Sequence, residues 1–472
     1  MISDGFEKLG REELIELVRV LYGEIAELKQ LVTDLRADNA ALQRELEKLK
    51  PNRRTSGRKG PGKRPGRRPG KGNFTNRKAP ENRSGPVDDV LLDSGPCREC
   101  GGELLPDGFE EVTITDLPEP VQPVTHTLRL EICRCARCGK RVRALHPDVP
   151  ADQTGATAHR VGKRAKAMAL VFHYQMGIPI RRIPKVLRLV GGLSITHSAL
   201  VQMALKHGSR KAAVQAYQEL RREIAQAPVV HTDDTSWRVG VQPAYVMGFE
   251  SARSSVYQIR LRHRNDEVRE VIGDDFQGVL VCDRGPSYDA KALAGVKQNK
   301  CLCHLERSVD KVTQSQPPAA QTVGLEIRRI LGKSLVLWKS WKQNEIPPDK
   351  YREQGAQLLE QLGHALRPRR LSPSNQTLVD GLRWQMDRGH LLRFLQDPSI
   401  APTNNDAERM LRDIVIARKV SQCSKNENGA RTTSIFRSIF RSAARRGMEL
   451  VNVGADILQG INPFSAPANH PP

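Results

Sequence analysis

Three acidic residues stand at the ends of predicted strands or near the start of a predicted helix. Asp233 follows the β-rich run PVVHT, Asp283 follows GVLVC, and Glu408 lies in the helical segment PTNNDAERMLRDIVIARK. A carboxylate beside a buried strand is costly unless it binds a cation, is paired or faces water. Its hard oxygen atoms suit Mg²⁺ or Mn²⁺ better than zinc. The three residues are therefore candidate ligands of a divalent-metal site.

The elements around these acids predict how they would meet. PVVHTDDTSWRV, AYVMGFES and SSVYQIRLR have the pattern of three consecutive strands, and a short helix and a fourth strand, GVLVCDRG, follow. The 50 residues from Asp233 to Asp283 are enough for two further strands and a helix. That order is typical of an RNase H-like α/β core, in which two adjacent strands present carboxylates to metal and a later helix supplies a third. Asn404 or Asn405 can cap that helix.

Four cysteines have the spacing of a zinc ribbon. Cys97 and Cys100 form one C-x-x-C pair, Cys135 and Cys138 form another, and a β-rich stretch joins them. Four thiolates in two such pairs predict a closed, structural Zn²⁺ site, whose metal would supply much of the folding energy of a small domain. Cys133 is a spare thiol outside the C-x-x-C spacing, and a redox role for one pair is the less favoured alternative.

The first fifty residues carry a leucine at every seventh position. These leucines are Leu14, Leu21, Leu28, Leu35, Leu42 and Leu49. From Leu21 onwards, mostly β-branched residues lie three positions before the leucines, with Asn39 as the single polar exception. This pattern predicts a parallel two-stranded coiled coil whose register Asn39 sets, and hence a homodimer. An amphipathic helix packed on its own chain is the alternative.

Net charge and composition bound the class of protein. The chain has 472 residues, of which 38% are hydrophobic, and a net charge of +22. Half of that excess, +11, lies in residues 51–86, a Pro- and Gly-rich stretch that we interpret as a disordered basic linker. The excess indicates a polyanionic partner, most commonly nucleic acid. No apolar run is long enough to span a membrane, and the first residues lack a secretory pattern.

Residues 155–212 have a helical pattern. HRVGKRAKAMALVFHYQ fits one amphipathic helix, and PIRRIPKVLRLVGG and SITHSALVQMALKHG fit two shorter helices around a glycine turn. Ser194, Thr196 or Ser198 can cap the last of them. This arrangement favours a helix-turn-helix-like DNA-binding domain, although helical hairpins also serve other purposes.

The order of the motifs carries a family resemblance. HTDDTSW, VCDRGPSYDA, CLCHLERSV and PTNNDAERMLRDIVIARK follow one another behind a leucine repeat, a basic linker and two C-x-x-C pairs. In this combination nearly the whole chain resembles the insertion-sequence sixty-six type of DDE transposase. The resemblance implies that Asp233, Asp283 and Glu408 are the catalytic, metal-binding triad. It also implies a helical insertion between Asp283 and Glu408, where three segments have helical patterns.

The resemblance further implies the reaction and the partners. Two Mg²⁺ or Mn²⁺ ions held by the triad would activate water or a DNA 3′-hydroxyl and stabilise the leaving oxygen, so that the enzyme cleaves DNA and transfers strands at the ends of an insertion sequence. Double-stranded DNA, accessory proteins of the same element and a bacterial, nucleoid-associated cytoplasmic location are expected, with no membrane partner. The candidate residues for holding the DNA backbone are Arg412, Arg418, Lys419, Arg67 and Arg68.

Two departures from the family pattern leave choices open. The family usually has Glu after its first Asp, where this chain has Asp234, so either Asp233 or Asp234 is the metal ligand; Glu306 is the fallback for the third ligand. The chain also replaces the family's tryptophan in the Cys-x-x-His segment with Leu302-Cys303. Cys282, Cys301, Cys303 and His304 are then either a second metal site or, as we favour, cysteines that fill the core. His231 and His304 either contact a scissile phosphate or satisfy core hydrogen bonds, and we interpret Trp237 as a core residue.

The predicted fold class is therefore a multidomain α+β protein. Its parts are a coiled coil (1–50), a basic linker (51–88), a zinc ribbon (89–150), a helix-turn-helix-like domain (155–212), an RNase H-like core (225–310), a helical insertion (311–400), a catalytic helix that completes the core (401–428) and a helical tail (429–472). Two other functions fit the same parts. One is a DNA-binding regulator without catalysis on a transposase scaffold, and the other is a hydrolytic nuclease that never joins strands.

Overall fold

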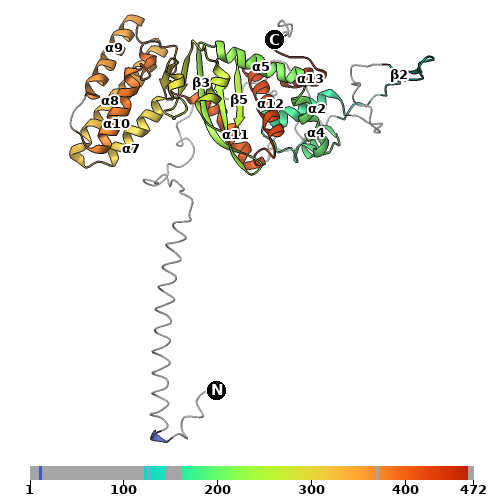
Figure 1. Ribbon diagram of the computed structural model, residues 1–472, viewed down its shortest axis with the longest axis horizontal. Helices are drawn as coiled ribbons and strands as arrows, with labels where there is room; N and C mark the ends of the chain where they lie inside the picture. Colours follow the sequence, from blue (N-terminus) through green and yellow to red (C-terminus); the bar gives the residue numbers. More distant parts are fainter. Residues whose placement is uncertain (1–9, 13–121, 126, 145–160, 368–370, 466–472) are drawn as a thin grey trace, which may run out of the picture. The chain divides into compact units, whose positions relative to one another are not determined.

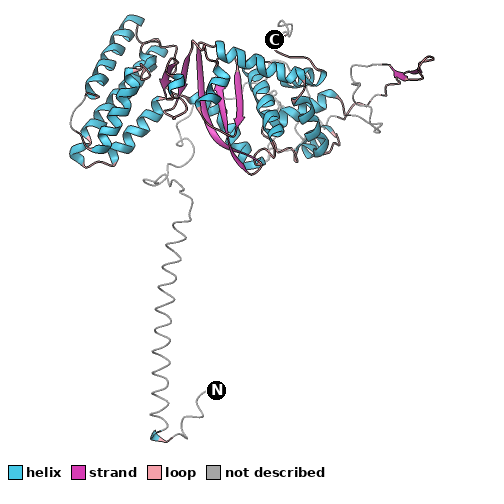
Figure 2. Cartoon of the chain, in the orientation of Figure 1, coloured by secondary structure: helices cyan, strands magenta, loops and turns pink. Residues whose placement is uncertain are grey.

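A computed structural model describes residues 10–12, 122–125, 127–144, 161–367 and 371–465 of the chain. The predicted coiled coil, the basic linker with Arg67 and Arg68, and the first cysteine pair, Cys97 and Cys100, lie outside these residues except for 10–12. The described part is a mixed α/β structure in which a mixed sheet is surrounded by helices (Figures 1 and 2). Within it, no helix is both long and apolar enough to cross a membrane.

A five-stranded sheet forms the centre of the described part. Its strands are β3 (Val229–Val239), β4 (Gln242–Glu250), β5 (Ser255–Arg260), β6 (Val279–Cys282) and β7 (Lys297–Lys300), in the spatial order β5-β4-β3-β6-β7. β3, β4 and β5 are antiparallel neighbours, whereas β6 pairs in parallel with both β3 and β7. The helix α6 (Asn265–Ile272) connects β5 to β6. The strands predicted from the sequence are thus present in the predicted order.

The two faces of the sheet are covered by different helices. Alternate residues of a strand point to opposite faces. Val230 packs in one apolar cluster with α6 and α5 (Lys211–Gln226), whereas Trp237 packs in another with α11 (Asn405–Ser421). The amphipathic patterns of these helices explain their placement, since each buries one apolar stripe.

The helix α12 (Glu427–Arg445) covers the edge strand β5. Three serines four residues apart on α12 accept hydrogen bonds from backbone N–H groups of β5: Ser442 from Ser255 at 2.9 Å, Ser438 from Tyr257 at 2.8 Å and Ser434 from Ile259 at 3.2 Å. An uncovered edge strand would leave these groups available to other strands. The serine ladder therefore closes this edge of the sheet.

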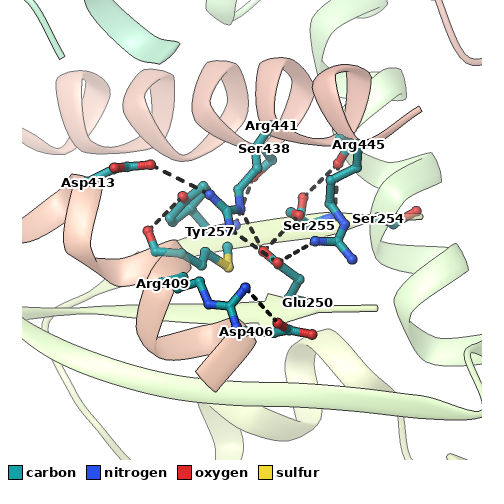
Figure 3. A network of polar contacts seen from close by, with 12 residues as sticks. Glu250, Ser254, Ser255, Tyr257, Asp406, Arg409, Asp413, Ser438, Arg441 and Arg445 are labelled. Atoms are coloured by element: carbon teal, nitrogen blue, oxygen red, sulfur yellow. Dashed lines mark hydrogen bonds and ion pairs between the residues drawn. The ribbon is translucent and has the colours of Figure 1, made fainter. Parts of the chain in front are cut away.

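An ion-pair network holds α12 to the end of β4 (Figure 3). Glu250, whose side chain is 2% exposed, accepts hydrogen bonds from Arg441 at 2.6 Å and from Arg445 at 2.6 Å. Arg441 also lies 3.6 Å from Asp413 on α11. Because both arginines reach one buried carboxylate, removing Glu250 would leave two cations without their partner.

The segment between β7 and α11 is helical and has its own apolar core. It contains α7 (Leu302–Gln314), α8 (Thr322–Lys342), α9 (Pro348–Ala365) and α10 (Pro373–Asp387), together with the short 3₁₀ turns η4 (Pro318–Ala320) and η5 (Arg393–Leu395). A further 3₁₀ turn, η3 (Lys291–Leu293), lies between β6 and β7. α7 packs on α8, and α8 packs on α9. The first two segments with helical patterns in the sequence correspond to α8 and α9. The third, residues 378–396, is α10 only as far as Asp387, and its end forms the 3₁₀ turn η5.

Residues 163–208 also form helices, and they pack against the C-terminal part of the chain. The elements are α2 (Lys163–Leu170), the π-helical turn η2 (Val171–Gln175), α3 (Ile183–Gly191) and α4 (His197–Gly208). α2, η2 and α4 contact α12 or α13 (Leu450–Gln459), whereas α3 packs with α2 and α4 in a small apolar cluster. Gly192 takes φ +59° in the turn after α3, a conformation that glycine adopts without strain. Thr196 caps α4 by accepting a hydrogen bond from the Ala199 N–H. The sequence predicted one helix through residue 175, but the hydrogen-bond pattern changes to a π-helix at Val171.

A short hairpin carries the second cysteine pair. β1 (Ile132–Arg134) and β2 (Arg141–Arg143) pair antiparallel, and Cys135 and Cys138 lie exposed in the turn between them. Gly139 takes φ +68° in this turn. The local backbone is therefore the tight turn that a C-x-x-C pair needs around a metal.

Candidate active site

Asp233 and Asp283 lie at the same level on neighbouring strands. The parallel pairing of β3 and β6 matches Val229 with Val279 and His231 with Val281. Continued by two residues, the same register places Asp233 beside Asp283, which follows directly after β6. The long-range β pairing thus brings the two carboxylates together from positions 50 residues apart.

Asp233 faces α11. Its cross-strand partner is Gly248, and a Cβ atom there would lie 3.0 Å from the Met410 Sδ atom of α11. Trp237, four residues further along the same face of β3, packs with Met410 as well. Asp234 points to the opposite face, where its Oδ1 lies 3.1 Å from His263 Nε2. This alternation separates the two adjacent aspartates.

Glu408 comes to the same place because the start of α11 is fixed at the sheet. Asn404 is fully buried, and its side-chain amide donates to the Thr232 carbonyl oxygen at 2.6 Å. Its backbone N–H points at the Cys301 sulfur, 3.3 Å away, and its carbonyl accepts from the Glu408 N–H at 3.0 Å. The sequence predicted Asn404 or Asn405 as the cap of this helix, and Asn404 does occupy the N-cap position, but its side chain bonds to β3 and makes no cap hydrogen bond with the helix.

The charges of the three acids act on one another. The pKa of Asp233 is raised to about 7, mainly by burial; the neighbouring carboxylates of Asp234, Asp283 and Glu408 contribute to the rise, and a hydrogen bond from the Asp234 backbone opposes it. Asp283 Oδ1 accepts the Gly285 N–H at 2.9 Å, which orients that carboxylate. Glu408 Oε1 is buried and has no hydrogen-bond partner among the described residues. A carboxylate oxygen buried without a donor is suited to a cation.

Cys301, His304 and Glu408 also lie together. One ligand atom from each of these residues falls within 4.8 Å of the others. Cys282 does not join them, because it lies on the other face of the sheet in the cluster with Val230, with its sulfur 3.5 Å from Gln298 Oε1. The described residues therefore do not form the four-residue site of Cys282, Cys301, Cys303 and His304, and Cys282 fills the core as the sequence analysis favoured.

Lys300, at the end of β7, is a fully buried lysine that the sequence pattern did not predict as a site residue. Its Nζ atom donates hydrogen bonds to the Asp283 carbonyl oxygen at 3.1 Å and to Gln298 Oε1 at 2.7 Å, and it forms an ion pair with Asp289 Oδ1 at 2.7 Å. Asp289 in turn accepts from Gln385 on α10 at 2.9 Å. The lysine thereby fixes the backbone at Asp283 and connects it to the helical insertion.

The candidate DNA-contacting residues of α11 differ in their surroundings. Arg412 and Lys419 are exposed. Arg418 is half-buried and donates to Thr235 Oγ1 at 3.4 Å and to Ser236 on β3. Arg418 therefore holds α11 to the sheet, whereas the other two side chains are free to meet solvent or a polyanion.

The comparison with protein families shows which family the chain belongs to. Residues 159–432 match the Transposase IS66 family, and this stretch is more than half of the chain. The chain belongs to the IS66 transposase family. The matched residues include Asp233, Asp283 and Glu408, and they also cover the helical insertion between the last two.

One curated relative carries a similar sequence. The "Uncharacterized protein y4jD" of Sinorhizobium fredii (strain NBRC 101917 / NGR234) is 25% identical over 253 residues, which are 51% of this chain and 47% of that protein. The chain thus matches about half the length of this relative.

Proposed function

We propose that this IS66-family protein is a DNA transposase that cleaves phosphodiester bonds and transfers strands at the ends of an insertion sequence with divalent metal ions. The observation that carries the proposal is the convergence of Asp233, Asp283 and Glu408 from β3, the end of β6 and α11. Their mutual effect on the pKa of Asp233 is that of carboxylates concentrated in one place. Such a set of hard oxygen donors fits Mg²⁺ or Mn²⁺.

In the proposed reaction, some residues would hold the metal ions and others would position those residues. Asp233, Asp283 and Glu408 would hold the metal ions, which when bound activate an attacking oxygen and stabilise the leaving oxygen at phosphorus. Two hydrogen bonds keep Asp283 in place. The Gly285 N–H donates to the Asp283 carboxylate, and Lys300 donates to the Asp283 backbone carbonyl oxygen. Asn404 keeps the start of α11, and so Glu408, at the end of β3.

The partners proposed for the protein follow from charge and sequence pattern. A net charge of +22 suits binding to double-stranded DNA, both the element ends and the target. The leucine repeat of residues 1–50 would join two chains in a parallel dimer. The two C-x-x-C pairs would hold one structural Zn²⁺ through Cys97, Cys100, Cys135 and Cys138.

Conservative variants of the three acids test the proposal. Asp233→Asn, Asp283→Asn and Glu408→Gln should each abolish cleavage and strand transfer of element-end DNA in Mg²⁺, because each removes a charged metal ligand. DNA binding should remain nearly unchanged, because it draws on many cationic contacts elsewhere. Asp387→Asn, on the exposed surface of α10, is the matched control and should be fully active.

The outcomes also separate the alternative functions. A wild-type protein that binds element ends but shows no metal-dependent cleavage would be the non-catalytic regulator. Cleavage without any joined product would indicate a hydrolytic nuclease. Full activity of the Glu408→Gln variant would mean that another residue is the third ligand. Glu306 of α7, which forms an ion pair with Arg328 at 2.6 Å, is the first candidate.

A further inference from the structure

A cavity lies at the far end of β3 and α11 from the three acids. Its volume is about 730 Å³, and α4, η2, the segment after α11 and α12 contribute to its wall. Trp237 of β3 and Ser421 at the end of α11 line it. Ser421 comes 13 residues after Glu408, or about 20 Å along the helix at 1.5 Å per residue. The cavity is therefore separate from the metal site, although it shares a helix and a sheet face with it.

Arg437 of α12 gives this cavity its chemical character. The residue is only 5% exposed, it lines the cavity, and its Nε atom has no hydrogen-bond partner among the described residues. Among those residues it also makes no ion pair. The carboxylate of Asp413 lies near enough to act on its charge, but Asp413 pairs with Arg441. Asp413 thus acts on Arg437 only from a distance, and no carboxylate of the described residues forms an ion pair with its guanidinium. Because a buried guanidinium without a directly bonded anion is costly, Arg437 indicates a ligand that supplies negative charge in contact with it.

The neighbouring groups do not supply that charge. Tyr174 and Tyr257 lie close to Arg437, but burial raises the pKa of both phenols far above neutrality, so they carry no charge. His173 also lines the cavity, and burial lowers the pKa of this histidine, which favours its neutral form. His173 and Tyr174 belong to the π-helical turn η2, a rare local structure that is frequent at functional sites.

We propose that this cavity binds one nucleotide unit, with its phosphate at Arg437 and its sugar and base against the apolar wall. A ligand site of this kind typically has a volume of about 300–1,000 Å³ and an apolar lining with a few placed polar groups. Here the polar groups besides Arg437 include Ser421, whose buried hydroxyl has no partner among the described residues, and the exposed Arg181 and Lys425. The nucleotide comes either from a DNA strand or from the free pool.

The experiment measures thermal unfolding of the full-length protein in phosphate-free buffer. The probes are dAMP, deoxyadenosine and a short single-stranded oligonucleotide, and the variants are Arg437→Met and, as a matched control on the same helix, the exposed Arg431→Met. We expect dAMP or the oligonucleotide to raise the unfolding midpoint of the wild type and of Arg431→Met by a few degrees, and not that of Arg437→Met. Lys425→Ser, which removes an exposed cation of the cavity wall, should reduce the shift.

The outcomes identify the source or overturn the proposal. A shift with dAMP that depends on Arg437 assigns the cavity to free nucleotides, and one with the oligonucleotide alone assigns it to a DNA strand. Without ligand, Arg437→Met should unfold at no lower temperature than the wild type, because it removes an unpaired buried charge. A large drop in that midpoint, an equal shift with deoxyadenosine, or shifts unaffected by Arg437→Met and Lys425→Ser would overturn the proposal. None of these readouts depends on DNA cleavage, so they stand apart from the proposed transposase activity.

Discussion

At the scale of single residues, the direction of a side chain matters more than its identity. Asp233 and Asp234 are adjacent and chemically equal, yet one faces α11 and the other pairs with His263 on the opposite face. The sequence left this choice open because a shift of one residue in register exchanges the two faces. The pairing of β3 with β4 and β6 sets the register, and it depends on contacts far apart in the chain.

This difference predicts the behaviour of two matched variants. Asp233→Asn should lower the cleavage rate by more than about a hundredfold, since a metal ligand contributes several kcal/mol to transition-state stabilisation. Asp234→Asn loses only a partly exposed pair with His263, so it should keep its activity and lose at most about 1 kcal/mol of stability. Single-turnover cleavage in Mg²⁺ measures both, and an inactive Asp234→Asn beside an active Asp233→Asn would show that the register is wrong.

His390 predicts a specific pH dependence of stability. Burial, and then the charges of Lys300 and Arg393, lower its pKa to about 4. In the unfolded chain the group takes up its proton near pH 6.5. Between pH 6.5 and 4 the unfolded state therefore binds more protons, and the free energy of unfolding should fall as the pH falls through this window. His390→Gln should remove roughly 2 kcal/mol of that fall between pH 7 and 4.5.

Urea unfolding at the two pH values provides the measurement. The matched control is His364→Gln on the exposed surface of α9, for which the pH dependence should stay that of the wild type. If the free energy of unfolding of His390→Gln falls between the two pH values as much as that of the wild type, the assignment of His390 as a buried neutral residue is contradicted.

At the scale of elements, the sequence predicted the strands and helices that have a periodic pattern of apolar residues. It missed the contacts whose role depends on a partner residue far away in the sequence. The strands and the insertion helices have clear patterns, so their existence could be predicted. The serine ladder of α12 is invisible by itself, because Ser434, Ser438 and Ser442 acquire their role only beside the edge of β5. Lys300 was missed for the same reason, since its partners Asp283, Gln298 and Asp289 form no pattern with it in the sequence.

The serine ladder of α12 predicts that a serine-to-alanine change there lowers the free energy of unfolding more than such a change usually does. Ser438→Ala would leave the buried Tyr257 N–H without an acceptor, and such a loss costs about 1–3 kcal/mol. Thr433→Ala on the same helix is the control, because among the described residues the Thr433 hydroxyl bonds only to the Gly429 carbonyl of its own helix. Chemical denaturation compares the two variants, and equal losses would mean that the contact with β5 contributes nothing of its own.

At the scale of the whole molecule, the described residues cover the part that matches the IS66 transposase family, and the N-terminal modules stay predictions. The hairpin that carries Cys135 and Cys138 has the turn geometry of a metal knuckle, and hydrogen bonds from the backbone at Cys138 and Arg137 lower the pKa of Cys135. A lowered thiol pKa favours the thiolate that binds metal. The other half of the predicted ribbon, Cys97 and Cys100, and nearly all of the predicted coiled coil lie outside the described residues.

The ribbon predicts one zinc per chain. Elemental analysis of freshly purified, reduced protein should give one equivalent, and Cys138→Ser should lower it, because the variant removes one of four thiolate ligands. Zinc-free wild-type protein would exclude the ribbon. Two equivalents would instead indicate that Cys301, His304 and Glu408 also bind zinc.

The central claim is that Asp233, Asp283 and Glu408 hold the metal ions of the reaction, and a change of ligand tests it most directly. Asp283→Cys replaces a hard oxygen ligand with a soft sulfur, which Mg²⁺ tolerates poorly and Mn²⁺ tolerates better. The measurement is cleavage of element-end DNA by this variant in each metal, beside the wild type. We predict that the variant is inactive in Mg²⁺ and regains cleavage in Mn²⁺, whereas cleavage in Mg²⁺ at the wild-type rate would contradict the account.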